Sequence, residues 1–134
     1  MSAIVLQDRL QKASTEFQKL QGDLSNAVEA RQRLDAQLSE NELVKKEFAQ
    51  LTTNNTVYKM IGPVLVPQDQ TEAKNNVDKR LEFIKGDIER VEGQLKELGE
   101  KSEKKKLEIV DIQTSLQQLQ QENQTPAGAS TIAV

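Results

Sequence analysis

The middle of the chain reads TVYKMIGPVLVP from residue 56 to residue 67, and this stretch decides the fold. Residues 56–61 are rich in β-branched and aromatic side chains with partial alternation, which predicts a strand. The Gly-Pro pair at 62–63 predicts a turn, and residues 64–66 predict a second short strand. Pro67 should end or border that strand, because proline has no N–H group to donate to a ladder. The stretch therefore predicts a β-hairpin.

Both flanks of this hairpin repeat their apolar residues at alternating spacings of four and three, which is the pattern of a coiled-coil seam. The first flank carries the seam at Leu6, Leu10, Ala13, Phe17, Leu20, Leu24, Ala27, Arg31, Leu34, Leu38, Asn41, Lys45 and Phe48. The second carries it, without a stutter, at Val77, Leu81, Ile84, Ile88, Val91, Leu95, Leu98, Ser102, Lys105, Ile109, Ile112, Leu116 and Leu119. At 1.5 Å per residue each flank would form a helix about 70 Å long.

A tight turn between two arms of equal length sends them back alongside each other, so their seams can close within one chain. Folding about the hairpin centre pairs Leu10 with Ile112, Leu24 with Leu98, Leu34 with Ile88 and Leu38 with Ile84. The polar seam residues Ser102 and Lys105 then fall near Leu20 and Phe17, whose large side chains can cover them. The predicted fold is mainly α, a long antiparallel two-helix coiled coil with a central β-hairpin.

Four segments follow from this pattern. They are an N-terminal coiled-coil helix at residues 1–51, a β-hairpin assembly segment at 52–70, a C-terminal coiled-coil helix at 71–122 and a disordered tail at 123–134. Asp69 or Thr71 can cap the second helix. The tail is expected to be disordered because it combines a proline with several small residues.

Composition removes most catalytic chemistry, since the 134 residues contain no Cys, His or Trp. These absences leave no thiol nucleophile, no imidazole base and no thiolate or imidazole ligand for a metal. We therefore expect neither an enzyme nor a bound cofactor.

Charges of both signs alternate along the chain, whose formal net charge is −3. A nucleic-acid-binding surface usually clusters its positive charge, and only the lysine run at 104–106 comes near such a cluster, with glutamates around it. No apolar run approaches the length of a membrane span, and the first residues lack the basic region of a signal peptide. We expect a cytoplasmic protein that binds neither nucleic acid nor membrane.

Apolar residues outside the seam gather around the hairpin. A two-stranded ribbon is at best marginally stable alone, and its open edges accept further strands. Burying five such side chains at about 2 kcal/mol each would contribute about 10 kcal/mol before entropy is counted. The predicted subunit-interface residues are Val57, Tyr58, Met60, Ile61, Val64, Leu65, Val66 and Phe83.

A second apolar surplus lies where the two ends of the coil meet, and exposed patches of this kind often bind other proteins. We predict that this tip captures non-native polypeptides, called clients below. The predicted client-binding tip consists of Ile4, Val5, Leu6, Leu10, Leu107, Val110, Leu116 and Leu119. The alternative for these residues is an ordinary helix end. The alternative for the whole chain is a structural or adaptor coiled coil that forms a parallel homodimer, which would have to loop out residues 57–66.

Residues 57–66 and 76–84, with segments 30–34 and 37–41 of the first arm, resemble β-type prefoldin subunits, and the resemblance covers residues 5 to 120. It implies a heterohexamer of two α-type and four β-type subunits whose hairpins join in a double β-barrel platform. It also implies an ATP-independent co-chaperone that binds unfolded actin and tubulin and delivers them to the cytosolic group II chaperonin. The partners expected from the resemblance are the other prefoldin subunits, these clients and the chaperonin.

Overall fold

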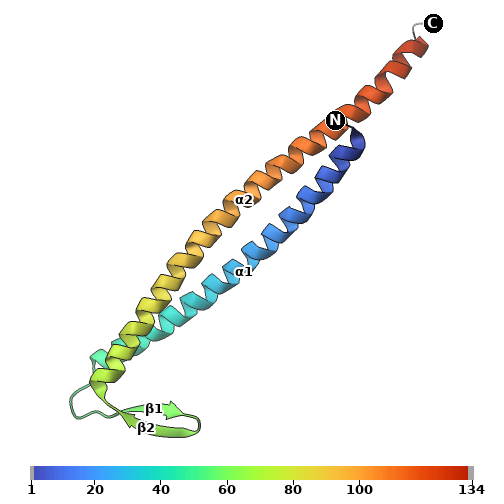
Figure 1. Ribbon diagram of the computed structural model, residues 1–134. Helices are drawn as coiled ribbons and strands as arrows, with labels where there is room; N and C mark the ends of the chain where they lie inside the picture. Colours follow the sequence, from blue (N-terminus) through green and yellow to red (C-terminus); the bar gives the residue numbers. More distant parts are fainter. Residues whose placement is uncertain (1, 133–134) are drawn as a thin grey trace. The chain divides into compact units, whose positions relative to one another are not determined.

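The computed structural model describes the backbone of residues 2–132 and the side chains of residues 2–123. Its elements, in chain order, are α1 (Ala3–Ala49), β1 (Val57–Ile61), β2 (Val64–Gln68) and α2 (Gln70–Ile132) (Figure 1). The predicted fold class is confirmed, because two long helices flank one antiparallel β-hairpin.

The chain divides into two compact units, each built from part of α1 and part of α2. The hairpin unit is Ala27–Gln94 and includes both strands. The terminal unit combines Met1–Asn26 with Leu95–Val134.

In the hairpin unit, the two helices pair in the antiparallel direction within one chain. The α2 seam residues Val77, Leu81, Ile84 and Val91 are buried, as is Ala27 of α1. Ion pairs cross from α1 to α2 between Arg31 and Glu92 at 2.8 Å and between Lys45 and Asp78 at 3.1 Å. These two contacts agree with the predicted Leu34–Ile88 and Leu38–Ile84 layers, because residue numbers rise along one helix as they fall along the other.

The terminal unit has its own small core around Leu6, Ala13 and Ile112, which are 5%, 3% and 4% exposed. Four partly buried seam residues pack against this core, namely Leu10, Ile109, Leu116 and Leu119. This cluster agrees with the predicted pairing of Leu10 with Ile112. Heptad periodicity accounts for these contacts, because it keeps one apolar stripe of each helix facing its partner.

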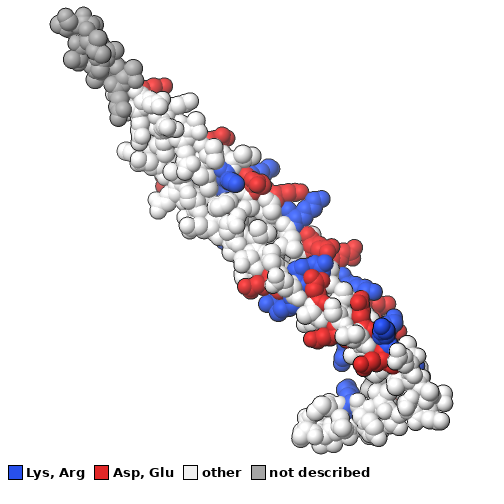
Figure 2. Space-filling model, turned by 180° about the vertical axis from the view of Figure 1, so that it is seen from behind, with Lys and Arg blue, Asp and Glu red and all other residues white. Residues whose placement is uncertain are grey.

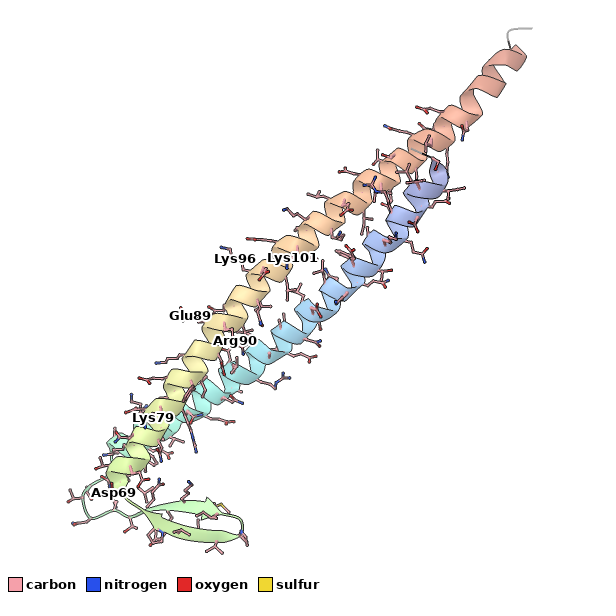
Figure 3. All side chains as sticks on the ribbon, viewed as in Figure 1. Asp69, Lys79, Glu89, Arg90, Lys96 and Lys101 are labelled. Carbon is pink, nitrogen blue, oxygen red and sulfur yellow. The ribbon has the colours of Figure 1, made fainter. Side chains whose placement is uncertain are left out.

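Asp69 forms the N-cap of α2, at the junction with the hairpin (Figure 3). Its Oδ2 atom accepts a hydrogen bond from the N–H of Glu72 at 3.0 Å, and its carbonyl oxygen accepts one from the N–H of Ala73 at 2.9 Å. Of the two candidates for this cap, Asp69 and Thr71, the structure selects Asp69. Such a cap satisfies one of the N–H groups that a helix start leaves without a partner.

The second strand is longer than the predicted residues 64–66, since β2 continues through Pro67 to Gln68. The register pairs Ile61 with Val64 and Tyr58 with Pro67. Gly62 has φ 59°, which with a following proline fits the type II′ turn that matches strand twist. Of the two alternatives for Pro67, ending the second strand or bordering it, the structure selects the second, because Pro67 lies in β2 opposite Tyr58, at a position that does not require an N–H donor toward β1.

The end of α2 also differs from the prediction of residue 122, because its backbone continues past Pro126 to Ile132. The predicted break depended on that proline, because a proline in a helix interior removes one N–H donor and kinks or breaks the helix. Side chains from residue 124 onward, together with residues 133–134, lie outside the described residues. Disorder of the tail at 123–134 therefore stays a prediction.

Candidate functional site

The hairpin leaves most of its apolar side chains open. Of the eight predicted subunit-interface residues, Val57 is half-buried and the others are exposed, from 38% for Val66 to 76% for Phe83. Phe83 lies on α2, so the predicted interface spans a helix as well as the two strands. Exposed apolar residues in this number are unusual for a surface that faces only water.

Side chains alternate between the two faces of a strand pair, so the register defines two surfaces. The first carries Tyr58, Met60, Leu65 and Pro67, and the second carries Val57, Lys59, Ile61, Val64, Val66 and Gln68. Lys59 is the single charged residue of the two strands. Figure 2 accordingly shows the hairpin as a nearly uncharged surface. Both surfaces are therefore suited to contact with other apolar side chains.

A hydrogen-bonded loop holds the hairpin at the start of α2. The Nε2 atom of Gln70 donates to the carbonyl oxygens of Thr52 at 2.9 Å and of Asn55 at 3.4 Å. The Oδ1 atom of Asn55 accepts hydrogen bonds from the N–H and the hydroxyl of Thr52 at 2.8 and 3.0 Å. The sequence pattern does not indicate these bonds, because Gln70 lies 15 to 18 residues from its two partners in the chain.

A small groove of about 140 Å³ lies beside the hairpin's attachment to the helices. Its lining residues are Lys45, Phe48, Ala49, Lys74, Val77 and Asp78. The Lys45–Asp78 ion pair contributes to this lining, and both side chains are more than half exposed. Sequence reasoning missed the groove, since its residues come from two helix ends far apart in the chain.

The predicted client-binding tip separates into two sets in the structure. Ile4, Val5, Leu107 and Val110 are exposed, at 79%, 47%, 63% and 49%. Leu6 is buried, and Leu10, Leu116 and Leu119 pack against the core of the terminal unit. These last four stabilise the coil, because a helix seam covers them, and only the first four are open to another protein.

A shallow groove of about 580 Å³ lies in the terminal unit and combines apolar with charged side chains. Its apolar lining is Leu6, Leu107, Ile112 and Leu119, and its charged lining is Arg9, Lys104, Glu108, Asp111 and Glu122. Leu107 connects this groove with the exposed set of the tip. The prediction of the tip considered apolar residues and did not include these charged residues. Their positions beside the seam residues in the sequence could have indicated that they line the same groove.

The polar seam residues of the terminal unit have specific partners. The Nε2 atom of Gln21 donates to the Oγ atom of Ser102 at 2.6 Å. The ammonium of Lys105 lies 2.5 Å from Glu16 Oε2 and 2.9 Å from Glu108 Oε2. Ser102 and Lys105 were expected to be covered by Leu20 and Phe17. The polar contacts instead go to the residues next to those two in sequence, because a polar group on a seam gains more from a hydrogen bond than from apolar cover.

The Glu16–Lys105 contact changes the ionisation of both groups. Its hydrogen bond from Lys105, with the positive charge of the same side chain, holds the pKa of the Glu16 carboxyl below its usual value. Hydrogen bonds to Glu16 and Glu108 raise the pKa of Lys105. Both groups therefore stay charged at neutral pH, and the contact acts as a polar layer of the seam.

Arg31 forms a comparable polar layer in the hairpin unit. Its guanidinium lies 2.8 Å from Glu92 on α2 and 3.0 Å from Asp35 on α1, with 28% of the side chain exposed. The Nη1 contact with Asp35 has ion-pair distance without hydrogen-bond geometry. Polar seam residues of this kind specify how two helices align.

In the described part of the chain, no helix has an apolar stretch long enough to cross a membrane. Among the same residues, no three Cys, His, Asp or Glu side chains come together in a way that could hold a metal ion.

Comparison with known proteins identifies one family. The prefoldin subunit family matches residues 11–127. Prefoldin subunit 6 of Bos taurus is 42% identical over 118 residues, which cover 88% of this chain and 92% of that protein. Prefoldin subunit 6 of Saccharomyces cerevisiae is 42% identical over 103 residues, with 77% and 90% covered. The crystal structure of the prefoldin beta subunit from Thermococcus strain KS-1 shares the fold, with a TM-score of 0.69 at 23% identity over 81% of this chain and 92% of that one.

Proposed function

Because the chain belongs to the prefoldin family, we propose that it acts as one of four β-type subunits in a heterohexamer with two α-type subunits. Prefoldin subunits assemble with one another and act as co-chaperones without enzymatic activity. The predictions of a chaperone subunit and of a chain that is not an enzyme are therefore confirmed. The hexamer composition, the clients and the residues that bind them belong to the proposal.

The observation that carries the proposal is the hairpin, most of whose side chains are apolar and exposed. Its exposed residues and Phe83 on α2 form the subunit interface that we propose. Burying each such side chain contributes about 2 kcal/mol, so a handful of them offsets the entropy lost on association. Strands of sister subunits complete the two-stranded sheet and cover its open edges.

The exposed tip residues Ile4, Val5, Leu107 and Val110 provide the client-binding surface in this proposal. The clients are unfolded actin and tubulin, which pass to the group II chaperonin in the cytoplasm. No nucleotide takes part, because capture requires only apolar contact. Each contact is weak, and several tips that hold one client together raise its affinity about a hundredfold or more.

Two measurements test this function. Native mass spectrometry of the complex isolated from cells through this chain should give a hexamer with sister subunits, whereas a homodimer would support the adaptor alternative. The purified hexamer should then keep chemically denatured actin from aggregating in the absence of ATP. A hexamer that leaves actin aggregation unchanged would retain the assembly proposal and refute the client.

A further inference from the structure

The backbone of the hairpin has two unlike outer edges. The register makes Gly62 and Pro63 a two-residue turn closed by Ile61 and Val64. In such a hairpin the closing pair exchanges hydrogen bonds, and pairs with and without ladder bonds alternate from there. The pairs Met60–Leu65 and Tyr58–Pro67 consequently direct their backbone groups outward, away from the partner strand.

This alternation explains why Pro67 is tolerated inside β2, as the residue before its last. The nitrogen of Pro67 faces outward, so no hydrogen bond between β1 and β2 is lost. The same arrangement gives β1 two outward N–H donors, at Tyr58 and Met60. The outer edge of β2 has one donor, at Leu65, because the proline at the next outward position has none.

We propose that β1 forms the principal junction with a sister prefoldin subunit, through an extended strand that pairs along its outer edge at Tyr58 and Met60. Pairing on the outer edge of β2 stops at Leu65 and is correspondingly weaker. This inference rests on the proposed function, which makes the hairpin an assembly site. The occupant is a β-strand, since outward N–H and C=O groups at alternate residues are satisfied together only by extended backbone.

The side chains at the outer edge of β1 are also suited to contact with an added strand. Tyr58 and Met60 share a face with Leu65 and Pro67, and that face carries no charge. β1 pairs with β2 alone among the described residues, so its outer edge has no strand partner in this chain, and Tyr58 and Met60 are 55% and 69% exposed. A strand added there would shield both side chains while its backbone pairs with both N–H groups.

Two matched proline substitutions test the difference between the edges. Met60→Pro removes an outward donor of β1, and Leu65→Pro removes the donor of its cross-strand partner on β2. Met60→Ala and Leu65→Ala control for the loss of each side chain. Each variant is produced together with the sister subunits, and the yield of intact hexamer is measured along with the helicity of the free chain.

We expect Met60→Pro to reduce hexamer yield about tenfold relative to Met60→Ala, as loss of one hydrogen bond with an acceptor left unpaired would do. Leu65→Pro should differ from Leu65→Ala by about threefold or less. Equal losses at the two positions, or a larger loss at Leu65, would overturn the inference. Such a result would leave the hairpin as an assembly site, whereas a full hexamer from every variant would count against the site itself.

Amide hydrogen exchange of the unmodified chain gives an answer that does not depend on how the variants fold. In the free chain the N–H groups of Tyr58 and Met60 should exchange rapidly, because their outward direction leaves them to water. Assembly should slow both at least tenfold more than it slows Leu65. Comparable slowing at Leu65 would contradict the unequal edges.

Discussion

Valine occurs in both regions where apolar side chains gather, with opposite exposure. Val64 in β2 is 56% exposed, whereas Val77 and Val91 in α2 are 5% and 3% exposed. The helical seam has its partner within the chain, and the hairpin does not. Similar residues thus stabilise the chain in the helical seam and are available to other subunits in the hairpin. Substitutions in the seam should therefore lower the stability of the chain, whereas substitutions in the hairpin should weaken assembly.

The largest effect is expected from placing charge on the hairpin. Val64→Asp with Val66→Asp should abolish co-purification of the sister subunits, because each charge buried without a partner costs several kcal/mol. The free chain should keep its helicity in circular dichroism. Val28→Asp is the matched control, since this exposed valine lies on α1 outside the hairpin and should leave assembly intact. Normal hexamer formation by the double variant would remove the hairpin from the interface.

A second comparison uses two residues of α2 that are close in sequence, Leu81 at 4% and Phe83 at 76% exposure. Leu81→Ala should lower the free energy of unfolding of the free chain by about 2–3 kcal/mol, because it leaves a cavity in the seam. Phe83→Ala should change that stability by less than about 0.5 kcal/mol and should instead weaken assembly. Thermal unfolding of the free chain measures the effect on stability, and the yield of hexamer measures the effect on assembly. Similar unfolding curves for both variants would show that the exposed fraction does not distinguish a residue that stabilises the chain from one that serves assembly.

A smaller effect is expected at the tip. Replacing Ile4, Val5, Leu107 and Val110 with serine should reduce the suppression of client aggregation about two- to fivefold. The loss should be partial, because the tips of the other subunits still bind the client. The hexamer should form normally, because none of these side chains belongs to the core. Leu6→Ala should have the reverse profile, with lower stability of the terminal unit. Unchanged client holding by the fourfold variant would make this tip an ordinary helix end.

The smallest effect is expected from the polar layer of the terminal unit. The lowered pKa of Glu16 means that its contribution is present above its ordinary value of 4.5 and is lost as the pH falls through the folded pKa. The raised pKa of Lys105 means that its contribution is full below 10.5 and is lost as the pH rises through the folded pKa. Glu16→Gln should lower the Tm slightly at neutral pH.

That Tm difference should vanish at strongly acid and strongly alkaline pH, where the wild-type pair is itself neutralised. Glu103→Gln, at an exposed carboxylate of α2 two residues from Lys105, is the control and should leave the Tm unchanged. A difference that persists in acid would mean that the contact does not depend on the charge of Glu16. Added salt should reduce the neutral-pH effect, since both side chains meet solvent.

The sequence by itself determined the type and order of the regular elements and their antiparallel pairing, but not where β2 and α2 end. A spacing of four and three residues is a geometric property of a helix seam, and a glycine before a proline between two β-rich runs specifies a hairpin. Antiparallel register followed from the equal lengths of the arms, and contacts such as Arg31–Glu92 agree with it. These features depend on local backbone geometry, which is specified by residues that follow one another closely in the sequence.

Only the tertiary structure decided which apolar residues remain open. Leu6 and Ile4 are two residues apart and were assigned to the same tip, yet one is 5% and the other 79% exposed. The partners of Ser102 and Lys105, the bond from Gln70 to Thr52 and the outward position of Pro67 were likewise absent from the pattern. Each depends on the lateral distance between elements distant in the chain, which periodicity along a single helix or strand does not contain.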